Sequence, residues 1–82
     1  MEQLLKDLLL SDGTAGFEEN IGALISKEFA KTCDSVETDN IGNVIGKKGK
    51  GKKKIMIDAH MDEIGFAVKY ISEKGYIYFI KI

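Results

Sequence analysis

The sequence of 82 residues contains no proline, no tryptophan and no arginine, and it has only one cysteine and one histidine. Because Cys33 has no second thiol to pair with, no internal disulfide can form, and a lone thiol among abundant lysines fits a reducing cytoplasm. No second histidine is available to build an oriented dyad, so Cys33 is expected to be a spectator and not a nucleophile. There is also no apolar run long enough for a signal peptide or a membrane span. We therefore expect a cytoplasmic protein without a membrane partner.

Charge of one sign does not dominate the chain, whose formal net charge is −1. No overall field therefore points to nucleic acid or to a membrane surface. Half of the lysines nevertheless fall within residues 47–54, which we call the lysine loop. It has no arginine and no interleaved aromatic residue, so a solvated loop is favoured over a nucleic-acid patch. A nucleic-acid binder would instead show an affinity that falls steeply with salt.

Apolar periodicity predicts two helices at the start of the chain. Leucines at positions 4, 5, 8 and 9 indicate a short amphipathic helix over residues 2–10, which the glycine-containing residues 11–16 interrupt. A second helix is predicted from about Phe17 to Lys31, with acids in its first turn and lysines near its end. Its apolar face is expected to comprise Phe17, Ile21, Leu24, Ile25 and Phe29.

Strand patterns follow after Cys33. We expect a short strand at residues 35–38, then a hairpin that pairs residues 43–46 with residues 54–60 through the lysine loop. Two more strands are predicted at residues 64–71 and 76–82, with Gly75 in a tight turn between them. Because natural domains seldom end on a bare apolar strand, we expect further sequence after it. The alternative is that this strand closes a small sheet at its edge.

The residues that could bind a metal or act in catalysis come directly after the apolar residues 55–57 in the chain. In an extended chain alternate side chains share a face, so Asp58, His60 and Asp62 are expected to project together. One imidazole nitrogen can bind a divalent metal while a carboxylate accepts a hydrogen bond from the other nitrogen. By spacing alone this signal is weak, since a single histidine at a strand end is more often a hydrogen-bonded surface or core residue.

The wider string adds a family resemblance. The letters AHMDEIGF at residues 59–66, after an apolar strand, closely resemble the first metal-binding segment of M42 aminopeptidases, which are often called glutamyl aminopeptidases or historically cellulases. The letters GFEE at residues 16–19 resemble an early segment of that family, although Ala15 stands where serine is usual. The letters DNIGNVIG at residues 39–46 resemble a third segment. The resemblance covers nearly the whole chain.

The resemblance implies a site and a reaction. His60 would bind one of two divalent ions (zinc or cobalt, with manganese also accepted), and Asp62 would act catalytically by orienting and polarising this site. Glu63 and Gly65 belong to the motif without a catalytic role, and Gly65 is expected to permit a tight backbone. Two-metal hydrolysis of peptide substrates also needs further carboxylates, a second histidine and a general base, which this sequence does not provide. The chain alone is therefore expected to be inactive.

The resemblance also implies an architecture. The fold class expected is α/β: two amino-terminal helices followed by a β-hairpin and further strands, an incomplete part of a zinc-peptidase-like α/β sandwich. Residues 1–66 would belong to the catalytic domain, residues 67–82 would begin an inserted β-rich domain, and the parent enzyme would form a homo-oligomer. The alternative is a standalone, non-catalytic binding or self-associating module.

Overall fold

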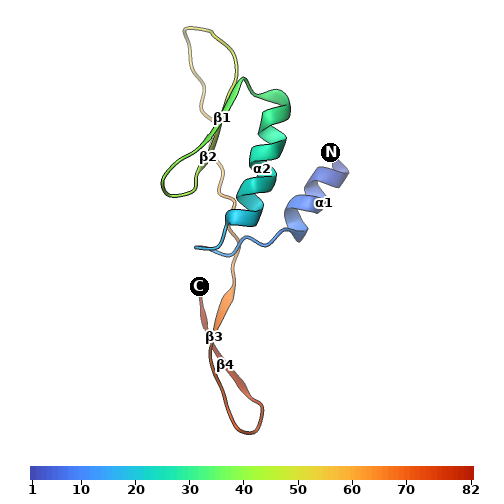
Figure 1. Ribbon diagram of the computed structural model, residues 1–82, viewed down its shortest axis with the longest axis vertical. Coiled ribbons are helices and arrows are strands. Elements are labelled where there is room, and N and C mark those ends of the chain that lie inside the picture. Colours follow the sequence, from blue (N-terminus) through green and yellow to red (C-terminus); the bar gives the residue numbers. More distant parts are fainter.

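The computed structural model, which describes residues 1–82, contains two helices followed by four strands (Figure 1). The elements are α1 (Glu2–Leu10), α2 (Glu19–Thr32), β1 (Ser35–Thr38), β2 (Val44–Lys47), β3 (Phe66–Ile71) and β4 (Ile77–Lys81). β1 pairs with β2, and β3 pairs with β4, in two separate antiparallel sheets. The predicted mixture of helices and strands is therefore confirmed.

The first helix has the predicted bounds, whereas α2 begins two residues later than predicted. A turn explains the delay, because the Phe17 amide donates to the Thr14 carbonyl at 2.8 Å and the Gly16 amide donates to the Glu18 carboxylate at 2.7 Å. Phe17 is consequently exposed and does not join the apolar face of the helix. Neither α1 nor α2 has the length and apolar composition that a membrane-spanning helix requires.

The predicted hairpin across the lysine loop is wrong, because β2 pairs with β1 instead. The register places Val36 opposite Gly46. The turn between these strands is held by the Asp39 carboxylate, which accepts hydrogen bonds from the Ile41 amide and from both the backbone and the side-chain nitrogen of Asn43 at 2.8–3.1 Å. This local network closes β1 onto β2 before the lysine loop is reached.

Residues 54–60, predicted as the second strand of that hairpin, belong to no strand. Ile55 and Ile57 are each 92% exposed, and Met56 between them is 88% exposed. An apolar run of this kind is typical of a strand buried between two neighbours. Here neither neighbour is present.

The second hairpin agrees with the prediction. β3 and β4 are joined by a tight turn in which Gly75 has φ +87°, and the Tyr76 amide donates to the Ser72 hydroxyl at 3.1 Å. Aromatic pairs across the strands reinforce the ladder. Phe66 and Phe79 meet edge to face at 4.7 Å, and Tyr70 and Tyr78 stack at 4.4 Å.

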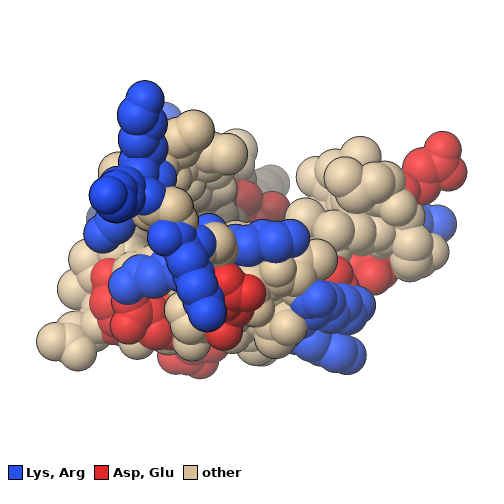
Figure 2. Space-filling model, turned by 90° about the horizontal axis from the view of Figure 1, so that it is seen from above, with Lys and Arg blue, Asp and Glu red and all other residues tan.

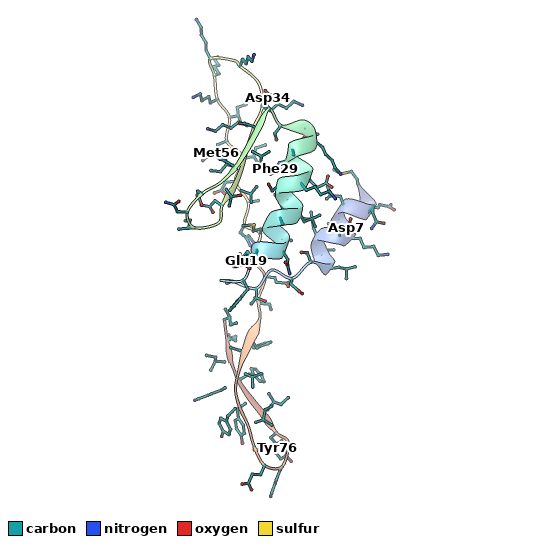
Figure 3. The ribbon with its side chains drawn as sticks, viewed as in Figure 1. Asp7, Glu19, Phe29, Asp34, Met56 and Tyr76 are labelled. Atoms are coloured by element: carbon teal, nitrogen blue, oxygen red, sulfur yellow. The ribbon has the colours of Figure 1, made fainter.

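Side chains are packed mainly where α2 lies on the β1–β2 hairpin, with Phe29 on the facing side of the helix (Figure 3). Only Gly13 and Ile21 are buried. The molecule measures 62 × 28 × 16 Å, and its radius of gyration is 17.3 Å, against about 12 Å for a compact domain of this length. The β3–β4 hairpin projects away from the rest (Figure 1). Much apolar surface is therefore left uncovered.

Candidate functional site

The side chains of His60 and Asp62 form a hydrogen-bonded pair. The Nδ1 atom of His60 lies 2.9 Å from the Oδ1 atom of Asp62 and 3.2 Å from its backbone oxygen. Both partners are acceptors, so Nδ1 must carry the proton. The lone pair of a neutral imidazole is then on Nε2, which is the arrangement of a metal-binding histidine held by a carboxylate. The side chain of His60 is 86% exposed, so Nε2 is accessible.

The pair lies just before the point where the motif is attached to the rest of the molecule. The Glu63 amide donates to the Gly13 carbonyl at 2.8 Å, and Thr14 and Glu63 form an isolated parallel β-bridge. Two residues later the Gly65 carbonyl accepts a hydrogen bond from the Ile82 amide at 3.0 Å. The motif is thus held by the α1–α2 loop and by the end of the chain.

Asp58 does not complete a metal site with this pair. No group of three or more histidine, cysteine, aspartate or glutamate side chains is placed to hold a metal ion. The donor set therefore fits one ligand of a metal centre, with its orienting carboxylate, and not a complete centre. The remaining ligands would have to come from outside residues 1–82.

Neither Cys33 nor the lysine loop forms a hydrogen bond or ion pair with His60 or Asp62. Cys33 is a free, half-buried thiol that packs beneath Gly46 together with Phe29. Seen from the end that carries the lysine loop, lysine side chains are spread over the molecule, with acidic side chains among them (Figure 2). The Asp34 carboxylate accepts a hydrogen bond from the Gly49 amide at 2.9 Å, which anchors the loop to the start of β1.

The contact of Gly13 and Thr14 with the motif is the feature that the sequence does not reveal. These residues read as an interruption between two helices, and their partner lies about fifty positions away. Gly65 likewise provides space and not an unusual backbone angle, because it lacks positive φ and a Cβ there would overlap Thr14 Cγ2. Only the spatial arrangement shows why glycine is present at positions 13 and 65.

Comparison with known proteins identifies the family. The profile of the M42 glutamyl aminopeptidase family matches residues 42–82, which include His60 and Asp62. The chain is 48% identical over 80 residues to a putative aminopeptidase of Acetivibrio thermocellus, covering 96% of the chain and 24% of that protein. It is 35% identical over 81 residues to the lysyl aminopeptidase of Pyrococcus furiosus, covering 98% and 23%. The chain therefore belongs to the M42 family, and it spans about a quarter of the length of these relatives.

Proposed function

We propose that residues 1–82 form the amino-terminal part of a two-metal aminopeptidase that removes amino-terminal residues from peptides. The observation that carries the proposal is the His60–Asp62 pair, which fixes the imidazole proton on Nδ1 and leaves Nε2 free within the segment matched by the family. In this proposal His60 binds one metal ion through Nε2. Asp62 orients the imidazole and increases its basicity, as carboxylate partners of metal-bound histidines do.

The bound ions, for which zinc and cobalt suit the donor and manganese is also possible, would supply a water activated for attack on the peptide carbonyl. What this chain provides toward that chemistry is one nitrogen donor in a fixed tautomer. It supplies neither a second histidine nor a cluster of carboxylates around the first. We therefore propose that the chain by itself does not hydrolyse peptides.

The exposed surfaces support an incomplete architecture. Residues 55–57 have the composition of a central strand, yet they are almost fully exposed. We propose that they lie inside the sheet of a zinc-peptidase-like α/β sandwich once further segments are present. Residues 1–66 would then belong to the catalytic domain, and residues 67–82, which project from it, would begin an inserted β-rich domain. The assembled enzyme would be a cytoplasmic homo-oligomer.

A chimaeric enzyme tests the proposal. Residues 1–82 replace the corresponding segment of the Pyrococcus furiosus lysyl aminopeptidase, to which they align over 98% of their length. We expect the chimaera to hydrolyse a lysyl chromogenic amide with added zinc, cobalt or manganese, while the 82-residue chain alone does not. Asp62→Asn should reduce activity or metal affinity by about 10- to 100-fold, and His60→Ala should reduce it further.

Lys52→Ala, in the lysine loop, is the matched control and should leave hydrolysis unchanged. A folded chimaera whose activity survives His60→Ala would refute the assigned role. Turnover by the purified 82-residue chain would refute the claim that the remaining groups lie outside it.

A further inference from the structure

We propose that Gly13 and Thr14, in the loop between α1 and α2, are positioning residues that hold the His60–Asp62 pair in place. This inference rests on the proposed function for its enzymatic meaning. The contacts that support it belong to this chain alone and can be tested without metal or substrate.

The pair has no backbone attachment on its amino-terminal side. No residue from 50 to 62 makes a backbone–backbone hydrogen bond, so the chain reaches His60 without secondary structure. The first such bond after His60 is that of the Glu63 amide to the Gly13 carbonyl, one residue beyond Asp62. This bond is therefore the backbone attachment nearest to the pair.

Gly13 fits tightly between its neighbours. Gly13 is one of the two buried residues, and a Cβ there would lie 2.9 Å from Ile21 Cγ2 and 3.4 Å from the Met61 carbonyl oxygen. Ile21, on the first turn of α2, is the other buried residue. The loop is thus wedged between α2 and the residue that follows His60.

On the other side of the bridge, Gly65 lies close to the side chain of Thr14. A Cβ at Gly65 would overlap Thr14 Cγ2 and lie 3.0 Å from its Oγ1 and 3.3 Å from its Cβ. Because Gly65 does not have positive φ, only space requires glycine there. Thr14 therefore sets how closely the motif approaches the loop, and such contacts determine whether a metal ligand is held in productive geometry.

The test is a double-mutant cycle in the 82-residue chain. Gly65→Ala introduces the overlap, and Thr14→Ala removes the Cγ2 and Oγ1 atoms that cause it. In the double variant, the Cβ atom of residue 14 remains, 3.3 Å from the new Cβ at position 65. NMR gives two readouts: hydrogen exchange of the Glu63 amide, and the His60 tautomer from its ring ¹⁵N shifts. Exchange at Gly22 and Cys33, whose amides donate within and at the end of α2, reports the fold.

We expect Gly65→Ala to reduce protection at Glu63 on the order of tenfold and to lower the population of the Nδ1–H tautomer, with protection in α2 unchanged. Thr14→Ala added to it should restore both readouts, which a role limited to general stability would not produce. If Gly65→Ala also loosens α2, Glu63→Pro serves instead, because it deletes the donor to Gly13 and should still lower the Nδ1–H population.

Wild-type values of both readouts in Gly65→Ala, or no recovery in the double variant, would overturn the inference. An unchanged tautomer in Glu63→Pro would do the same. If both readouts behave as expected in the 82-residue chain but the chimaera is inactive, the proposed enzymatic function is contradicted. The role of Gly13 and Thr14 in holding the pair is not contradicted by that result.

Discussion

Replacing Gly46 by alanine probes the packing of α2 against the β1–β2 hairpin. A Cβ at this position would lie 2.7 Å from Cys33 Sγ and 2.8 Å from the Cδ2 atom of Phe29, distances that force a neighbour to move. Overpacking of this kind costs about 1–3 kcal/mol, while the reduced freedom of the unfolded chain returns about 0.4–1 kcal/mol. We expect a net loss of about 1–2 kcal/mol, which is large against the few kcal/mol available to a domain of this size.

Urea unfolding followed by far-UV circular dichroism measures this loss as a lower midpoint. Gly51→Ala is the matched control, because its Cβ would meet nothing closer than 3.8 Å and its φ is not positive. Adding Cys33→Ala to Gly46→Ala should recover part of the loss, since the contact with Phe29 remains. If Gly46→Ala unfolds at the same urea concentration as Gly51→Ala, the described packing is incorrect.

Two further predictions concern the Asp39 turn and the exposed surface. The hydrogen bond from the Asn43 side chain, helped by backbone amides, lowers the pKa of Asp39, so its contribution to stability is present above about pH 4 and is lost as the pH falls through the lowered value. Asp39→Asn should therefore lower the thermal midpoint at neutral pH, and the difference from wild type should vanish in acid; an equal difference at both pH values would contradict this reasoning. The accessible surface of 7727 Å² exceeds the roughly 4,900 Å² of a compact protein of this mass. Size-exclusion chromatography with light scattering should therefore show a folded chain that self-associates without a fixed stoichiometry as its concentration rises, whereas a discrete, well-folded oligomer would favour the self-associating module.

The elements that local sequence determines could be predicted. The leucine pattern placed α1, and Gly75 placed the β3–β4 turn at its observed position. The β1–β2 pairing was not predicted, because the lysine loop was interpreted as a hairpin turn between residues 43–46 and residues 54–60. The side-chain hydrogen bonds of Asp39, which close the chain earlier, have no counterpart in hydrophobic periodicity.

The candidate site also has features that the local sequence predicts and features that it does not. His60 and Asp62 are two residues apart, so their hydrogen bond is a local property that the motif could indicate. Asp58 was expected beside them on the assumption of a paired strand, which residues 54–60 do not form. The bridge from Thr14 to Glu63 joins distant parts of the chain, and no local pattern predicts it.

In the proposed enzyme, His60 binds one ion of a two-metal centre through Nε2. Inductively coupled plasma mass spectrometry can count the metal ions in the chimaera after equilibration with zinc or cobalt and removal of free metal. We expect two ions per subunit in the chimaera and fewer in its His60→Ala variant, with Lys52→Ala unchanged. Two ions retained in a folded His60→Ala variant would contradict this role of His60.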